Sequence, residues 1–126
     1  MKTGGLAMVN ILIVDDDDLT RELIASKLKQ RDYETCEAAD GDEALDRARN
    51  SAPDLILLDM NLPRMTGWEL APLLRSHPRT ENIPIIALTG DESTEAVEAA
   101  HDAGCDRYLK KPIDFDRLVR AIEELT

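Results

Sequence analysis

The sequence predicts an open, doubly wound α/β domain, in which a parallel sheet carries helices on both faces. Apolar runs at 9–14, 53–59 and 83–90 do not alternate with polar residues, as half-exposed strands do. Such continuous runs are typical of parallel strands that are covered on both faces. Stretches with apolar residues three and four positions apart lie between these runs and predict amphipathic helices. With 126 residues, the chain is expected to form one domain with one core.

Strands and helices are expected to alternate along the chain. Two weaker strands, 33–38 and 106–110, bring the number of strands to five, and a helical pattern follows each strand, so the order is βα repeated five times. The apolar faces predicted for the helices are, in chain order, Leu19, Leu23, Ile24 and Leu28; Ala44, Leu45 and Ala48; Leu70, Leu73 and Leu74; Ala96, Val97 and Ala100; Phe115, Leu118, Val119, Ile122 and Leu125.

Polar residues mark where helices are expected to begin. Asp18 is the predicted N-cap of the first helix, and Ser93 or Thr94 that of the fourth, because their side-chain oxygens can accept the free N–H groups of a first turn. Pro72 lies inside the third helical pattern, where proline removes a hydrogen bond. The third helix is therefore expected to start late or to be kinked.

Charge and composition exclude several classes of function. The net charge of −11 argues against a surface for nucleic acid or anionic membranes, since phosphate binding needs clustered Lys and Arg. No stretch approaches the roughly 18 apolar residues of a membrane span. Cys36 and Cys105 are too few for a disulfide framework or a zinc site, and are expected to be buried free thiols. A cytoplasmic protein is expected.

The chain has an expected boundary near its start. Residues 1–8 lack the apolar segment of a signal peptide, and Met8 stands just before the first predicted strand. These eight residues are interpreted as a vector-derived leader, and 9–126 as the domain. No output domain is recognised after the fifth helix, so the domain is either a stand-alone protein or a piece of a longer one.

Chemically active side chains stand at the carboxyl ends of four predicted strands. Asp15 to Asp18 follow the first strand, Asp59 ends the third, Thr89 the fourth, and Lys111 follows the fifth. In doubly wound sheets these ends meet at one edge, where ligands bind. Four adjacent carboxylates repel one another and need a compensating positive charge. Asp59 by itself can be either an exposed cap residue or a nucleophile.

This combination favours a divalent cation and phosphoryl chemistry. Mg²⁺ is usually held by one or two carboxylates, here Asp16 and Asp59, with other oxygens completing its shell. A carboxylate can also attack phosphorus to form an aspartyl phosphate. Lys111 and Thr89 would then hold the phosphoryl oxygens that the metal leaves free.

The chain from 11 to 125 resembles the receiver domain of two-component response regulators. The resemblance rests on four motifs in the expected order: VDD at 14–16, PDLILLDMNLPRMTG at 53–67, LTG at 88–90 and KKP at 110–112. It implies a flavodoxin-like (βα)₅ fold with a five-stranded parallel sheet of order 2-1-3-4-5.

The resemblance also implies a role for each matched residue. Asp59 is the phosphoacceptor. Asp16 binds Mg²⁺ or Mn²⁺ directly, Asp15 acts through water, and the backbone carbonyl of Asn61 is a further ligand. Lys111 stabilises the phosphoryl group.

Three further positions match the switch of this family. Thr89 is the switch hydroxyl and Tyr108 the aromatic residue that turns inward with it, so that the face of the fourth helix, fifth strand and fifth helix changes shape. Lys111–Pro112 matches a cis peptide bond. Asp17 has no assigned role; it is either a solvated charge or an acid that tunes the metal site.

The function implied is that of a phosphoacceptor in a two-component phosphorelay, which takes a phosphoryl group from a histidine kinase or a histidine phosphotransfer protein and loses it slowly to water. It is not expected to be an enzyme beyond this self-catalysed chemistry. One alternative comes from Asp16 to Thr20, which fit the D-x-D-x-T signature of haloacid dehalogenase-like phosphatases, with Asp16 as nucleophile. The other is a receiver-like interaction domain that does not use phosphate.

Overall fold

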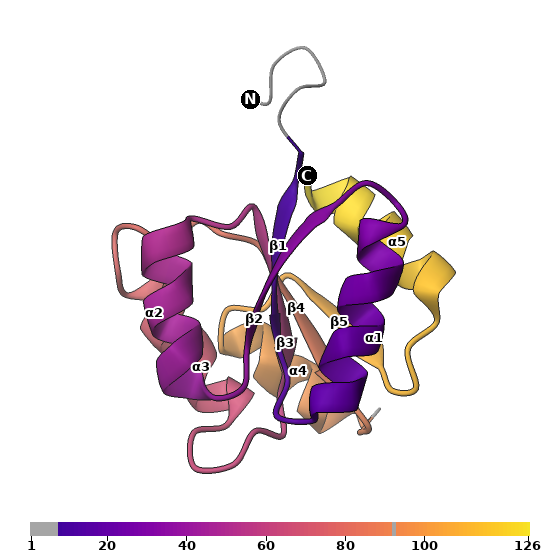
Figure 1. The fold of residues 1–126 in the computed structure, drawn as a ribbon. Coiled ribbons are helices and arrows are strands. Elements are labelled where there is room, and N and C mark those ends of the chain that lie inside the picture. The colour runs from indigo at the N-terminus through magenta and orange to yellow at the C-terminus, as the bar shows by residue number, and fades with distance from the viewer. Residues whose placement is uncertain (1–7, 92) are drawn as a thin grey trace.

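The computed structural model describes residues 8–91 and 93–126 (Figure 1). The predicted leader lies outside this part except for Met8. The strands are β1 (Asn10–Val14), β2 (Glu34–Ala38), β3 (Leu55–Asp59), β4 (Ile85–Thr89) and β5 (Arg107–Lys110). The helices are α1 (Asp18–Lys29), α2 (Gly41–Ser51), α3 (Gly67–Arg75), α4 (Thr94–Asp102) and α5 (Phe115–Leu125).

All strand pairs are parallel, and the strand order is β2-β1-β3-β4-β5, so the predicted doubly wound (βα)₅ fold is confirmed. The chain reverses its direction of winding after β2, since β3 pairs on the other side of β1. In such a sheet the reversal leaves a crevice at the carboxyl ends of β1 and β3.

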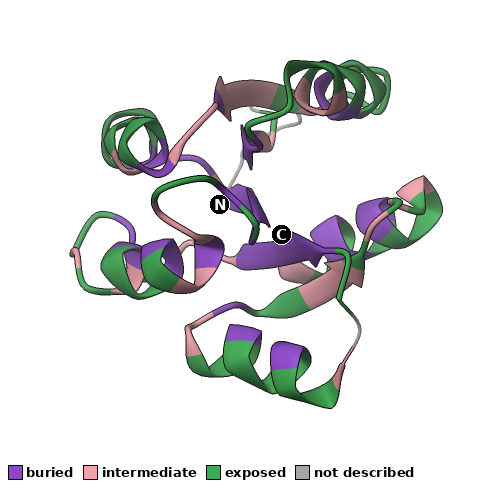
Figure 2. Ribbon diagram, turned by 90° about the horizontal axis from the view of Figure 1, so that it is seen from below, coloured by how far each residue is buried: buried purple, intermediate pink, exposed green. Residues whose placement is uncertain are grey.

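Two hydrophobic layers hold the helices against the sheet (Figure 2). On one face, α1 and α5 cover alternate residues of the central strands, among them Ile13, Leu57 and Leu88. On the other face, α2, α3 and α4 cover the residues between them, among them Val14 and Leu58. Because successive residues of a strand point to opposite faces, strands buried on both sides need apolar residues at every position. This explains the runs without alternation.

Four residues predicted for the buried helix faces are exposed: Leu19 and Leu23 in α1, Leu73 in α3 and Val97 in α4. A spacing of three and four residues marks a stripe on a helix, but the neighbouring elements cover only its centre. Leu19, which is 76% exposed, and Leu23, which is 54% exposed, lie one turn apart on the same side of α1.

The N-cap predicted for α1 is wrong by one residue. Asp17 has extended backbone angles and is the N-cap, whereas Asp18 is the first helical residue. The carboxylate of Asp17 accepts the hydroxyl hydrogen bond of Thr20, and this bond is the main cause of the lowered pKa of Asp17. The prediction for α4 is confirmed at Ser93, whose hydroxyl accepts the N–H of Ala96 at 3.1 Å.

The third helix does not start late. It begins at Gly67 behind a capping box, in which Thr66 and Glu69 bond to each other's backbone N–H groups. Pro72 is the sixth residue of the helix, where its missing N–H leaves the carbonyl of Trp68 without the usual donor. The capping box stabilises the first turn and offsets part of this loss.

None of the helices that the structure describes has the length and apolar character needed to span a bilayer. Both cysteines are free, but only Cys105 is fully buried, whereas Cys36 is partly exposed on β2. Burial raises the pKa of both thiols, that of Cys105 to about 11.

We expect Cys105 to resist alkylation by iodoacetamide at pH 8, because a thiol with this pKa is about one part in a thousand thiolate at that pH, and burial also blocks access. Cys36 should be alkylated faster than Cys105 in the folded protein, and the two thiols should be alkylated at similar rates in denaturant. Mass spectrometry of peptides over time measures the two rates. Equal rates in the folded protein would contradict the burial of Cys105.

Candidate functional site

The residues predicted for the site lie at one edge of the sheet, the edge that faces the viewer in Figure 2. Asp15 directly follows β1, Asp59 is the last residue of β3, Thr89 is the last residue of β4, and Lys111 directly follows β5. They come together because the four strands are parallel and neighbours in the order β1-β3-β4-β5.

Three carboxylates form an acidic cluster at this edge. One oxygen from each of Asp15, Asp16 and Asp59 lies within 4.8 Å of the other two. Asp15 and Asp59 are buried, whereas Asp16 is exposed. No hydrogen bond or ion pair within the described part of the chain engages the carboxylate of Asp16. The cluster therefore has two fixed acids beneath one acid that is open to solvent.

Lys111 supplies the positive charge that the acidic cluster needs. Its Nζ lies 3.1 Å from Oδ2 of Asp15 and 3.3 Å from Oδ2 of Asp59. The Lys111–Pro112 peptide bond is cis. The backbone N–H of Lys111 donates to the carbonyl of Thr89 at 2.8 Å, so that the start of the β5–α5 connection stays beside the end of β4.

Backbone N–H groups orient the two buried acids. The N–H of Asp17 donates to Oδ1 of Asp15 at 2.9 Å, and the N–H of Asn61 donates to Oδ1 of Asp59 at 3.0 Å. Each buried carboxylate thus has one oxygen on a backbone donor and the other on Lys111. Such fully engaged carboxylates have little freedom to turn away from the cluster.

Burial and charge act in opposite directions on the pKa values of this site. Burial raises the pKa of Asp59 above its usual value, and the Asn61 N–H and the charge of Lys111 only partly offset it. For Lys111, burial by itself lowers the pKa, but the charges of Asp59 and Asp15 outweigh burial, and the net pKa is raised. Lys111 is therefore charged at neutral pH, and Asp59 is a more basic carboxylate than an exposed one.

The oxygen donors fit a hard divalent cation. Two oxygens on opposite sides of one Mg²⁺ are about 4.2 Å apart, close to the span of the Asp15, Asp16 and Asp59 oxygens. Neighbouring carboxylates with too little positive charge around them repel one another, and this repulsion favours the binding of a cation. Lys111 brings one positive charge against these three carboxylates, so two negative charges in excess remain to attract a cation.

Thr89 and Tyr108, the predicted switch residues, lie on the same face of the sheet. Tyr108 pairs in register with Ala87, which is two residues before Thr89 on β4, so the side chains of all three point to one side. Thr89 is fully buried, and its hydroxyl accepts the N–H of Asp91 at 3.2 Å. Tyr108 is half-buried against the core on that face.

Arg21 is part of this region and was not predicted from the sequence. Its guanidinium donates to the carbonyl of Asp15, to Asp18 and to Glu37. The only sequence signal was the spacing of three between Asp18 and Arg21, which indicates an ordinary pair on a helix surface. The bond between Arg21 and Glu37 joins α1 to β2 and depends on the tertiary fold.

Comparison with known proteins identifies the relatives of this chain. The family model described as response regulator receiver domain matches residues 11–123. The polar-differentiation response regulator DivK of Brucella anthropi is 35% identical over 114 residues, which cover 90% of this chain and 93% of DivK. The chemotaxis protein CheY4 of Vibrio cholerae superposes with a TM-score of 0.90 at 32% identity, over 95% of this chain and 100% of that one.

One structural relative contains a metal. The receiver domain of a sensor histidine kinase from Pseudomonas aeruginosa was crystallised with a magnesium ion coordinated in its active-site cleft. It superposes with a TM-score of 0.86 at 30% identity, over 94% of this chain and 98% of that one.

Proposed function

Because the chain belongs to the family of response regulator receiver domains, we propose that it is the phosphoacceptor of a two-component phosphorelay, with Asp59 as the phosphorylated residue and 9–126 as the domain. Receiver domains are in general signalling domains and not enzymes. The observation that carries the proposal is the buried carboxylate of Asp59, which ends β3 beside two further acids and Lys111. A cytoplasmic location, where a histidine kinase would meet it, is part of the proposal.

In the proposed reaction, a carboxylate oxygen of Asp59 bonds to phosphorus while the bond between phosphorus and the donor's imidazole nitrogen breaks, and the electron pair stays on that nitrogen. Lys111 stabilises the charge of the phosphoryl oxygens. Asp16, Asp59 and the carbonyl of Asn61 would hold Mg²⁺ or Mn²⁺, and Asp15 would act through water. Bound metal supplies charge neutralisation and orientation of the phosphoryl group.

The surface beside the site supports a protein as the phosphoryl donor. The exposed side chains of Leu19 and Leu23 lie next to the site on α1. Leu23 also lines a hollow together with Lys111, Ile113 and Phe115. An exposed apolar patch beside a reactive group favours a macromolecular partner over a small molecule. A histidine kinase or a histidine phosphotransfer protein is the proposed partner.

The proposed signal is a change of packing at the face of α4, β5 and α5. Thr89 is buried at the end of β4 beside the site, and its hydroxyl can donate to a phosphoryl oxygen on Asp59 while it still accepts from Asp91. A movement of Thr89 would change the space beside Tyr108, which lies on the same face of the sheet. We therefore expect two alternative packings of Thr89 and Tyr108, and phosphorylation of Asp59 would shift the population from one to the other.

We expect a gain of one phosphoryl group in intact mass after incubation with acetyl phosphate and Mg²⁺, and no gain when EDTA replaces Mg²⁺. Borohydride reduces an aspartyl phosphate to homoserine, so peptide mapping locates the acceptor, which should be residue 59.

Two results would favour the alternatives. Homoserine at residue 16 would support the phosphatase-like mechanism, in which Asp16 is the nucleophile; the structure gives this little support, because Asp18, the second acid of that signature, is paired with Arg21 at 2.6 Å. An unchanged mass would support a receiver-like domain that does not use phosphate.

A further inference from the structure

The side chain of Arg21 connects three segments around the acidic cluster. Its Nη1 donates to the backbone carbonyl of Asp15 at 2.7 Å, its Nη2 to Oδ1 of Asp18 at 2.6 Å, and its Nε to Oε1 of Glu37 at 2.9 Å. Only 13% of the side chain is exposed. A guanidinium is rigid and planar, so three bonds in three directions fix the segments relative to one another.

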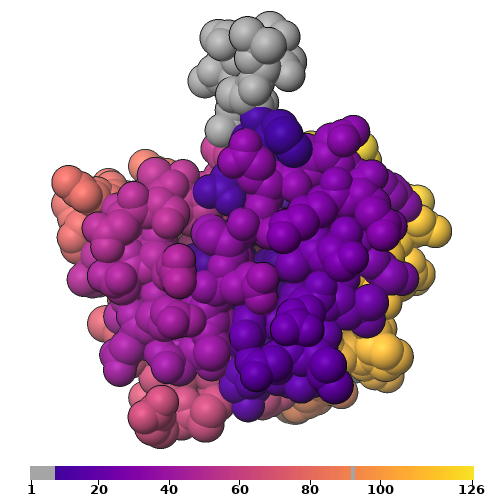
Figure 3. Space-filling model, in the orientation of Figure 1, coloured from indigo at the N-terminus to yellow at the C-terminus, as the bar shows by residue number. Residues whose placement is uncertain are grey.

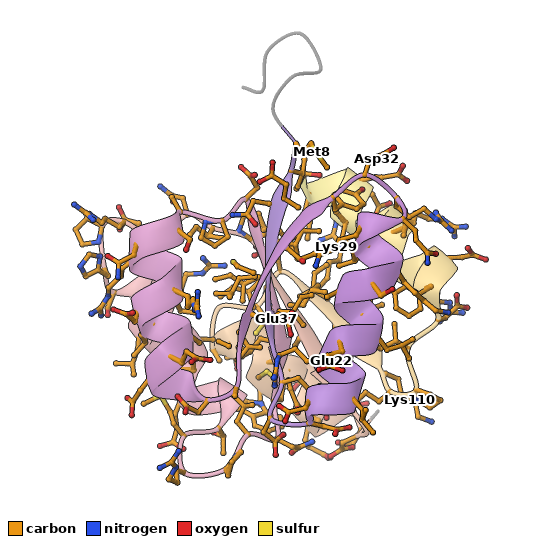
Figure 4. The ribbon with its side chains drawn as sticks, in the orientation of Figure 1. Met8, Glu22, Lys29, Asp32, Glu37 and Lys110 are labelled. Atoms are coloured by element: carbon orange, nitrogen blue, oxygen red, sulfur yellow. The ribbon has the colours of Figure 1, made fainter. Side chains whose placement is uncertain are left out.

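Glu37 reaches Arg21 because of the register of the sheet. Glu37 pairs with Ile13 of β1, and Ile13 points to the face that α1 and α5 cover. Figure 4 labels Glu37 on β2, and Figure 3 shows that β2 lies at the outer surface between α1 and α2. Arg21 on α1 therefore connects the edge strand with the loop that carries the acids.

The bond to Asp15 has a direct consequence for Asp16. The carbonyl of Asp15 and the Cα atom of Asp16 belong to one planar peptide unit. A donor that holds this carbonyl therefore also fixes the position of the Cα atom from which the side chain of Asp16 extends. The carboxylate of Asp15 is held as well, by Asp17 and Lys111. The side chain of Asp16 has no such support within the described residues, and its position depends on the backbone that Arg21 holds.

We propose that Arg21 is a positioning residue of the divalent-cation site, which sets the affinity for the cation by orienting the peptide unit between Asp15 and Asp16. The inference rests on the metal site of the proposed function. Partners that orient metal ligands in this way typically change metal affinity about 10- to 100-fold when they are lost.

The charge of Arg21 alone predicts the opposite effect. A cation near the site repels Mg²⁺, so a variant without this charge should bind the metal more tightly, and most strongly at low salt. However, Arg21 is already paired with Asp18 and Glu37, so little of its charge acts on the cluster. The sign of the change in affinity therefore distinguishes positioning from simple repulsion.

The test compares Arg21→Lys and Arg21→Gln with wild type by titration with Mn²⁺, using electron paramagnetic resonance to measure free Mn²⁺. Lysine keeps the charge and loses the planar fork, whereas glutamine loses both. We expect both variants to bind Mn²⁺ at least about tenfold more weakly, with the same ratio at 0.05 and 0.5 M KCl.

Arg75→Lys is the matched control. Arg75 is also a largely buried arginine with several bonds to other segments, to the carbonyls of Gly104 and Ile83 and to Asp106. These partners lie at the amino ends of β4 and β5, away from the acidic cluster. Arg75→Lys should lower the melting temperature and leave Mn²⁺ affinity unchanged.

Four results would overturn the inference, the last of them together with the proposed function. Wild-type affinity in both Arg21 variants would show that the peptide unit needs no such support, and tighter binding in Arg21→Gln would show that repulsion dominates. Equal losses in Arg75→Lys and the Arg21 variants would show that general destabilisation explains the effect. If wild type itself binds no Mn²⁺, the proposed function fails together with the inference.

Discussion

Lys111→Met is expected to lower the rate of phosphorylation by acetyl phosphate about 10²- to 10³-fold at saturating Mg²⁺, which is the usual cost of removing one donor that stabilises charge in a transition state. The Nζ of Lys111 lies within 3.3 Å of both buried carboxylates, at a position where it can also reach a phosphoryl group on Asp59. Methionine keeps the length and the apolar stem of the side chain, so the decrease in rate measures the contribution of the ammonium group.

The same variant is expected to bind Mg²⁺ more tightly. Lys111 and the metal compete for the negative charge of the same acids, and without the ammonium group the cluster has only the metal to neutralise it. Calorimetric titration with MgCl₂ measures the affinity, and intact mass over time measures the rate. Asp59→Asn is the control, which should take no phosphoryl group. An unchanged rate in Lys111→Met at saturating Mg²⁺ would remove Lys111 from the proposed mechanism.

The fold could be predicted because the apolar runs of β1, β3 and β4 are typical of a parallel sheet with helices on both faces. Strands that are apolar at every position must be covered on both faces, and helices between them must cross over the sheet. The convergence of Asp15, Asp59, Thr89 and Lys111 followed from this, since each stands at the carboxyl end of a parallel strand.

The role of Arg21 could not be predicted in the same way. On α1, an arginine three residues after an aspartate indicates a solvent-facing pair. Its burial arises because β2 pairs with β1 in a register that places Glu37 against α1. The family resemblance implies this pairing, but the register is not visible in the local sequence. The exposed Leu19 and Leu23 were mispredicted for a related reason, because periodicity identifies an apolar stripe but not the part of it that a neighbour covers.

Gly67→Ala is the substitution for which we expect the largest loss of stability among the glycines at helix starts. Gly67 is the first residue of α3, and an added Cβ would lie 2.5 Å from Sδ and 2.7 Å from Cα of Met60, and 3.2 Å from the carbonyl oxygen of Asp59. Met60 cannot yield, because its side chain is fully buried and its N–H is bonded to the carbonyl of Leu88 at 3.0 Å.

Either α3 or the end of β3 must therefore move. Overpacking of this kind typically costs about 1–3 kcal/mol of unfolding free energy, although alanine is otherwise preferred to glycine within a helix. Because Met60 directly follows the phosphoacceptor, the shift should also displace Asp59 from Lys111. We expect Gly67→Ala to lower both the midpoint of urea unfolding and the rate of phosphorylation by acetyl phosphate.

Gly41→Ala is the matched control, since Gly41 is the first residue of α2 and is buried as well. There the added Cβ would approach Sδ, Cβ and Cγ of Met65 at 2.7, 3.1 and 3.2 Å, which are all atoms of a side chain that is only partly buried and can shift, whereas Gly67 meets backbone atoms. Gly41→Ala should therefore change stability much less and leave the rate unchanged. If Gly67→Ala is phosphorylated at the wild-type rate, the rigid contact between α3 and the end of β3 does not hold Asp59 in place, and the bonds from Asn61 and Lys111 alone position the phosphoacceptor.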